Sequence, residues 1–119
     1  MCSSDLVPAL TGGPVRYGLA HSLPCKDNQY DIVTMFDVME HLTEADCMAV
    51  INELQRVATK YIVLSISNRP SIVNGIDVHI TKKPYDEWDL ILRENIEAKN
   101  IQHLINNRAC VCEMWVIEL

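Results

Sequence analysis

The chain has 119 residues and a formal net charge of −6 at pH 7, with 49% hydrophobic and 22% charged residues. This length suits one domain, and the composition is typical of a soluble globular protein. The acidic charge argues against nucleic-acid binding, which needs clustered basic residues. No apolar run approaches the roughly 18 residues that span a bilayer, so we expect neither a nucleic acid nor a membrane as partner.

The cysteine pattern predicts reduced thiols. The chain has five cysteines, an odd number, and none of them forms a C-x-x-C pair of the kind found at zinc or redox sites. The amino terminus lacks the charged and then apolar pattern of a secretory signal. We therefore expect a cytoplasmic protein.

The first half of the chain predicts two strands and a helix. A strand is expected at residues 15–20, after Gly12, Gly13 and Pro14, and another at 31–36. The second strand is apolar on both faces, which is typical of a parallel sheet covered by helices. A helix is expected at residues 44–58, with Thr43 as its N-cap and an apolar stripe along one side.

The second half predicts a further strand, a helix and a hairpin. The strand covers residues 61–67, and a long loop at 68–83 leads to a helix that opens at Pro84. Residues 101–105 and 109–117 flank a polar turn and are predicted to pair as a hairpin. Alternating strands and helices indicate an α/β fold with a mainly parallel sheet.

Polar side chains follow the two central strands at their carboxyl ends. Asp37 comes directly after the strand at 31–36, and Ser65, Ser67 and Asn68 end the next strand. Open α/β sheets bind their ligands in the crevice at the carboxyl ends of the strands. We therefore expect Asp37 at a ligand site, although an acidic residue also caps strand ends without any other role.

Five segments match, in the same order, sequence motifs of one enzyme family. They are GLAHSLP at residues 18–24, DNQYD at 27–31, FDVMEHL at 36–42, ELQRV at 53–57, and DVHI at 77–80 with Pro84 and Trp88. These segments are similar to G-D-A-x-x-L-P, D-x-S-F-D, F-x-V-L-E-H-L, E-x-x-R-V and D-x-x-H-I…P…W. Over most of residues 15–92 the chain thus resembles the class I S-adenosylmethionine-dependent methyltransferases.

The resemblance implies a fold and a cofactor site. The fold is a Rossmann-like three-layer α/β sandwich with a mostly parallel sheet and an antiparallel carboxyl-terminal hairpin. S-adenosylmethionine would lie across the strand ends, with Leu19 and Ala20 near the adenine and Phe36 and Asp37 near the methionine portion. Asp5 resembles the acidic residue that binds the ribose. The family has an acidic residue where this chain has Leu19, so adenine recognition would rest on backbone groups and packing.

The resemblance also predicts an incomplete amino terminus. The family's first strand and its glycine-rich loop precede the position of Asp5, so residues 1–119 are expected to form a single partial domain. Residues 1–14 would be irregular, and residues 1–6 match what a sequencing-adapter end encodes. In the family's sheet order, 3-2-1-4-5-7-6, the strand at 31–36 would then have a free edge, which favours self-association.

The predicted reaction is transfer of the cofactor's methyl group to an acceptor, most simply a small molecule. Such catalysis relies on proximity and orientation, and His41 or His79 would act as the base where the acceptor must lose a proton. The alternative is a non-catalytic fragment or partner-binding module that does not bind the cofactor.

Other interpretations of the same residues remain open. Glu40 and His41 would also suit the solvated start of the next helix, and His79 would suit a surface loop. Asp37, His41, Asp77 and His79 are metal-ligand types, but their long spacings carry no ligand signature, so no metal site is predicted. Trp88 is expected in the core, with substrate stacking as the lesser alternative.

Overall fold

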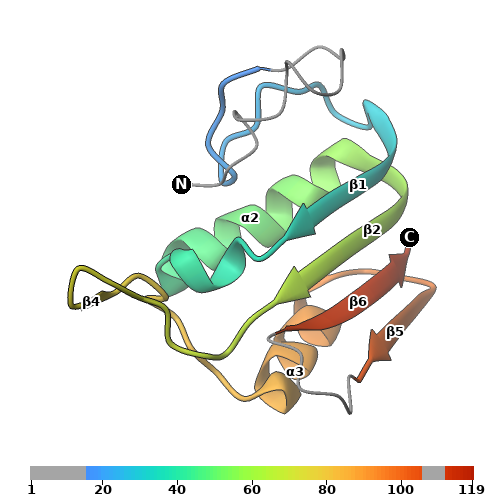
Figure 1. Ribbon diagram of the computed structural model, residues 1–119. Coiled ribbons are helices and arrows are strands. Elements are labelled where there is room, and N and C mark those ends of the chain that lie inside the picture. Colours follow the sequence, from blue (N-terminus) through green and yellow to red (C-terminus); the bar gives the residue numbers. More distant parts are fainter. Residues whose placement is uncertain (1–15, 106–111) are drawn as a thin grey trace, which may run out of the picture.

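The computed structural model describes residues 16–105 and 112–119, and Figure 1 shows their arrangement. Strands and helices follow one another in an α/β order. They are β1 (Tyr30–Phe36), the short 3-10 helix η2 (Met39–His41), α2 (Glu44–Val57), β2 (Ala58–Ile66), β3 (Ile72–Val73), β4 (Ile76–Asp77), α3 (Tyr85–Asn95), β5 (Asn100–Leu104) and β6 (Glu113–Glu118). None of the helices in these ranges has the length and apolarity needed to cross a bilayer.

The main sheet has four strands in the order β1-β2-β6-β5. β1 and β2 are parallel, while β6 runs antiparallel to both β2 and β5. The order agrees with the 4-5-7-6 part of the expected sheet. The predicted Rossmann-like α/β fold with an antiparallel carboxyl-terminal hairpin is therefore confirmed, although the turn of that hairpin lies outside the described residues.

Both predicted helices form, and local sequence explains where they begin. α2 starts after Thr43, whose Oγ1 accepts a hydrogen bond from the Asp46 N–H at 3.3 Å. α3 starts after Pro84, whose fixed φ and missing N–H suit the entry to a helix. Each helix has acidic residues in its first turn and an arginine in its last, which complements the helix dipole.

The core lies between the two helices and one face of the sheet. Alternate strand residues point to this face and are at most 9% exposed, namely Met35, Ile62, Leu64, Ile66, Trp115 and Ile117. They pack with helix residues that include Val50, Ile51, Leu54, Trp88 and Leu92. Trp88 is thus a core residue, as expected. Because both helices cover the same face (Figure 1), the described residues supply two layers of the sandwich.

β1 is the outer strand of the sheet and is not buried on both faces as its sequence suggests. Its edge has no neighbouring strand among residues 16–105 and 112–119. Ile32 and Phe36 point away from the helices and are 57% and 51% exposed. The sequence pattern describes a strand that needs cover on both faces, whereas the described residues cover one. Within the described ranges, no strand pairs with the edge that the sequence analysis expects to be free.

The strand expected at residues 15–20 is not found in the described part of that range. Residues 16–18 are irregular, and Leu19 only forms an isolated bridge with Ser22. A strand needs a neighbour to satisfy its backbone groups, and no described strand lies beside this segment. Its position after Gly12, Gly13 and Pro14 was therefore an insufficient signal.

The long loop at 68–83 contains a small hairpin that the sequence analysis did not predict. β3 and β4 pair antiparallel, and Asn74 and Gly75 connect them with φ angles of 51° and 78°. Two positive φ values are typical of a type I′ turn, for which Asn-Gly is the favoured pair. The hairpin shapes the loop beside the carboxyl ends of β1 and β2.

Candidate functional site

The carboxyl ends of β1 and β2 meet at Asp37 and Ser65. The Asp37 N–H donates to the Ser65 carbonyl oxygen at 3.0 Å and lies 3.1 Å from Ser65 Oγ, and that hydroxyl donates to Asp37 Oδ1 at 3.0 Å. Asp37 has φ 55°, in the left-handed region. Non-glycine residues enter this region at a cost, and such residues concentrate at functional sites. Asp37 thus marks a sharp turn out of the sheet.

Glu40 is fully buried three residues later. Its exposure is 0%, and neither carboxylate oxygen has a hydrogen-bond partner. Burial raises the pKa of this carboxyl, and the nearby Asp37 charge raises it further. The N–H groups of Glu40 and Ser67 lie near the carboxyl without forming hydrogen bonds of good geometry, and together with His79 they oppose the shift. The interpretation of Glu40 as a solvated helix start is wrong, because the residue is 0% exposed, and its backbone carbonyl accepts from the Thr81 N–H.

His41 and His79 face each other next to Glu40. Their ring centroids are 4.6 Å apart, and the planes are nearly perpendicular at 89°. Nδ1 of His41 lies 3.2 Å from the Val78 carbonyl oxygen, and Nδ1 of His79 lies 2.5 Å from that of Arg69. A carbonyl only accepts, so each Nδ1 donates its proton, and Nε2 is the lone-pair nitrogen of this tautomer.

The His41 ring is held in its neutral form. Burial and the neighbouring His79 lower the pKa of His41, against a smaller opposite effect of the Val78 carbonyl. A neutral imidazole at neutral pH is able to accept a proton or to bind a metal. His41 and His79 are therefore chemically competent for the base role predicted from the sequence.

Two cavities flank the segment of residues 37–42. The first, which we call the β1 cavity, has a volume of about 370 Å³ and is lined by residues that include Gly18, Leu19, Ala20, Val33 and His41. The second, the histidine cavity, has a volume of about 270 Å³ and is lined by residues that include Asp37, Glu40, Arg69 and His79. The first is mainly apolar, and the second carries charged groups.

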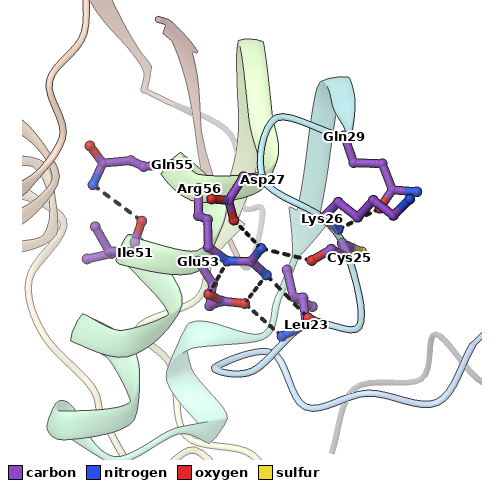
Figure 2. A network of polar contacts seen from close by, with 9 residues as sticks. All are labelled: Leu23, Cys25, Lys26, Asp27, Gln29, Ile51, Glu53, Gln55 and Arg56. Carbon is purple, nitrogen blue, oxygen red and sulfur yellow. Dashed lines mark hydrogen bonds and ion pairs between the residues drawn. The ribbon is translucent and has the colours of Figure 1, made fainter.

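The loop at one wall of the β1 cavity is fixed by Glu53 and Arg56 of α2, as Figure 2 shows. Arg56 pairs with Glu53 through two hydrogen bonds of 2.7 and 2.8 Å. Glu53 Oε2 also accepts from the Leu23 N–H at 2.8 Å, and Arg56 Nη1 donates to the Cys25 carbonyl and to Asp27, each at 2.8 Å. The E-x-x-R-V segment thus clamps residues 23–27 to α2.

The clamp is electrostatically favourable. Arg56 lowers the pKa of Glu53, and the hydrogen bonds to Glu53 and Asp27 raise the pKa of Arg56. The Asn28 N–H donates to the Arg56 carbonyl at 2.7 Å, which adds a backbone contact to the same loop. The loop that precedes β1 is therefore tied to α2, the helix that follows β1 in the chain.

Asp77 holds the loop that carries His79 and is not part of the histidine cavity's lining. Its Oδ1 accepts from the N–H groups of Ser71 and His79, each at 3.0 Å, and its Oδ2 pairs with Lys82. These donors lower the pKa of Asp77 to about 2. These contacts give Asp77 a structural role, because they fix the shape of the loop that carries His79.

The predicted cofactor residues lie at different places around residues 37–42. Leu19 and Ala20 line the β1 cavity, Asp37 lines the histidine cavity, and Phe36 is 51% exposed at the end of β1. Asp5 lies outside the described residues. Of the predicted bases, His41 borders the β1 cavity and His79 the histidine cavity.

The sequence analysis missed the burial of Glu40 and the role of Arg69. Glu40 follows the apolar residues Val38 and Met39, but nothing local distinguishes a buried carboxylate from a solvated one. Arg69 contributes its carbonyl to His79 and lines the histidine cavity, and only the loop fold reveals this.

Comparison with known proteins supports the family resemblance. A family described as a methyltransferase domain matches residues 6–63. No match was found among curated proteins. Several solved structures share the fold, and all of those reported below are less than 25% identical to the chain.

Three of these structures illustrate the extent of the match. The PH0226 protein of Pyrococcus horikoshii is 13% identical with a TM-score of 0.61, over 85% of this chain and 57% of that one. A protein of Thermotoga maritima is described as a methyltransferase and possible histamine N-methyltransferase. It is 16% identical with a TM-score of 0.60, and the match covers 85% of this chain and 61% of that one. A methyltransferase of Aquifex aeolicus is 18% identical with a TM-score of 0.59, over 96% and 58%.

The chain spans about 60% of the length of these structures. The domain match covers the loop clamped by Arg56, β1, η2 and α2, and the fold match extends over the remaining strands. Residues 6–63 are thus similar to a methyltransferase domain, and the chain has the fold of solved S-adenosylmethionine-dependent methyltransferases.

Proposed function

We propose that the protein transfers the methyl group of S-adenosylmethionine to an acceptor, most simply a small molecule, at the carboxyl ends of β1 and β2. The methyltransferase-domain match to residues 6–63 carries this proposal. The site geometry supports it, because polar groups and the histidine cavity lie at the edge where α/β sheets bind their ligands, and the β1 cavity extends from residues 38–42 along β1. The free thiols of Cys25 and Cys47 agree with a cytoplasmic location, which we also propose.

The residues around the β1 cavity fit an adenine-containing cofactor. The cavity is mainly apolar and has a volume of about 370 Å³, so a flat ring would pack there against Leu19 and Ala20. Asp37, at the end of β1, offers a carboxylate to the ammonium group of the methionine portion. When bound, the cofactor supplies an electrophilic methyl group on a sulfonium centre.

The chain's own residues would orient the acceptor and take up its proton. His41 is neutral and half-buried, and it borders the β1 cavity. His79 is the alternative base, since its Nε2 has the same free lone pair and it lines the adjacent cavity. Either imidazole suits proton transfer from an acceptor hydroxyl or amine.

Calorimetry with S-adenosylmethionine tests the cofactor site. We expect binding to the 119-residue chain, or to a version extended by the upstream codons of its gene, and tighter binding when Leu19→Asp restores an acceptor for the adenine amino group. Leu104→Asp, at an exposed leucine on β5, is the matched control and is expected to change nothing. Absence of binding by both the chain and its extended version would exclude the enzyme proposal.

A non-catalytic, partner-binding role is the second candidate. The observation that favours it is the exposed edge and outer face of β1, where Ile32 is 57% exposed. Cofactor binding separates the two candidates, because only the enzyme proposal requires it.

A further inference from the structure

The histidine cavity is lined by a buried carboxyl group whose polar atoms have no partner. Glu40 is 0% exposed, and neither of its carboxylate oxygens has a hydrogen-bond partner. An unpaired buried carboxylate costs several kcal/mol, so native structures pair such groups with donors, cations or metals. The methyl-transfer proposal assigns no role to this residue.

Two imidazoles complete a donor set around Glu40. One ligand-type atom from each of Glu40, His41 and His79 lies within 4.8 Å of the others. Ligand atoms on a tetrahedral zinc ion, with bonds of about 2.0–2.2 Å, are roughly 3.4 Å apart. Side-chain rotations that move each ligand atom by roughly 1 Å would therefore bring the three atoms into the coordination shell of one ion.

Both histidines have the outer contacts that metal-binding histidines use. Their Nδ1–H groups donate to the backbone carbonyls of Val78 and Arg69, which leaves Nε2 as the ligand atom. Such a carbonyl fixes the tautomer and the orientation of a metal-bound imidazole. These contacts orient both rings.

Backbone contacts hold the two contributing segments together. The Thr81 N–H donates to the Glu40 carbonyl at 3.1 Å, and Asp77 Oδ1 accepts from the His79 N–H at 3.0 Å. The ligands thus come from η2 and from the loop after β4; the Thr81–Glu40 bond joins these two segments, and Asp77 holds the loop around His79. A preorganised donor set of this kind binds an ion with little reorganisation.

We propose that Glu40, His41 and His79 bind one divalent transition-metal ion, with Zn²⁺ suiting the donor set. Two imidazoles and one carboxylate favour zinc-like ions over Mg²⁺, which prefers oxygen ligands. Three protein ligands leave a coordination position open for water. A lone pair that binds the ion is unavailable to a proton, so the bound ion and the general-base role of these histidines exclude each other. The site does not depend on the methyl-transfer proposal.

Metal titration of the full chain tests this site directly. After treatment with a chelator, the protein is expected to bind one equivalent of Zn²⁺ by calorimetry, and Co²⁺ is expected to give visible d–d absorption without a thiolate charge-transfer band. A thiolate band would place the ion at the cysteines and overturn the proposal. Displacement of Co²⁺ by stoichiometric Mg²⁺ would overturn the proposed preference of the site for zinc-like ions over Mg²⁺.

Variants locate the ion. We expect Glu40→Gln and His79→Gln each to weaken Zn²⁺ binding by at least about tenfold, with far-UV circular dichroism confirming that each variant is folded. His103→Gln is the matched control, because His103 lies on β5 and is paired with Glu113 at 2.7 Å, and its Zn²⁺ affinity should equal that of the wild type. His79 lies in a loop, so its variant keeps the test decisive if Glu40→Gln does not fold. No Zn²⁺ binding by the wild type, or unchanged binding by folded His79→Gln, would refute the site.

Discussion

Asp37 combines backbone strain with a side-chain contact at the residue where β1 ends. Its φ of 55° turns the chain away from the sheet, and Ser65 Oγ donates to its carboxylate at 3.0 Å. Asp and Asn tolerate the left-handed region better than other residues with a Cβ, because their short polar side chains form local hydrogen bonds. The same residue type thus stabilises the turn and places a carboxylate at the crevice.

We expect Asp37→Ala to lower the free energy of unfolding by about 1–2 kcal/mol, since it keeps a Cβ in the left-handed region and loses the Ser65 contact. Asp37→Asn should stay within about 0.5 kcal/mol of the wild type, because it retains both features. Urea unfolding of the two variants measures the difference. Equal stabilities would show that the Ser65 contact and the backbone preference contribute nothing.

Cys47 provides a residue-scale test of the core. It is 3% exposed, its Sγ donates to the Met39 carbonyl at 3.3 Å, and burial raises the pKa of its thiol to about 11. Only the thiolate reacts with alkylating reagents. We therefore expect iodoacetamide at pH 8 to modify Cys47 only after unfolding, with the folded-state rate rising towards pH 11.

Peptide mapping by mass spectrometry gives the readout for this thiol. Cys25, which is half-buried and free, serves as the internal control and should react in the folded protein. Comparable modification of both residues under native conditions would contradict the buried position of Cys47.

At the scale of the elements, the Glu53–Arg56 clamp connects α2 with the loop that lines the β1 cavity (Figure 2). A guanidinium has the planar set of donors needed to bind a carboxylate and two loop acceptors at once, and an ammonium does not. The E-x-x-R-V segment thus supplies the side chains that hold the loop. It affects the β1 cavity indirectly, through the position of that loop.

We expect Arg56→Lys to lower the free energy of unfolding by about 1–3 kcal/mol, because hydrogen bonds to Cys25 and Asp27 are lost together with the bidentate pair. The amide of Leu23 should exchange faster with solvent, since its acceptor Glu53 is no longer held. Arg93→Lys is the control, because Arg93 is a more exposed partner of Asp89 in α3, and such pairs contribute about 0.5 kcal/mol. An equal loss in both variants would argue against the clamp.

The sequence predicted the elements whose signals are local. Thr43 and the apolar stripe after it located α2, and Pro84 located α3. Asn74 and Gly75 carried an equally local turn signal, and the two-residue strands beside them were too short to recognise. The strand at residues 15–20 was wrongly predicted, because strand formation depends on a neighbour that the local pattern does not reveal.

The candidate site was predictable only where it follows from topology. Asp37 was found because parallel strands end at a common edge. The burial of Glu40 and the contact between His41 and His79 depend on the loop after β4, which lies almost forty residues further along the chain. Long-range contacts of this kind leave no periodic signal in one sequence.

At the scale of the whole molecule, the described helices cover one face of the sheet, and no described helix covers the other. The helices pack on the side of Met35, Ile62 and Leu64, while the opposite side presents Ile32 and Phe36 to solvent along the free edge of β1. A free edge has unpaired N–H and C=O groups, and proteins often protect such edges with lysine. In β1 this edge is instead bordered by large apolar side chains.

We therefore expect the chain to self-associate as its concentration rises, through pairing of β1 edges around a two-fold axis. Ile32→Lys should weaken this association about tenfold or more, because burying one isoleucine side chain contributes about 1.5–3 kcal/mol and a tenfold change corresponds to about 1.4 kcal/mol. Ile72→Lys is the matched control, since Ile72 is 62% exposed on β3, in the separate β3–β4 hairpin. Sedimentation velocity over a concentration series measures both variants. A monomer at all concentrations, or equal weakening by the two substitutions, would show that the β1 edge does not mediate association.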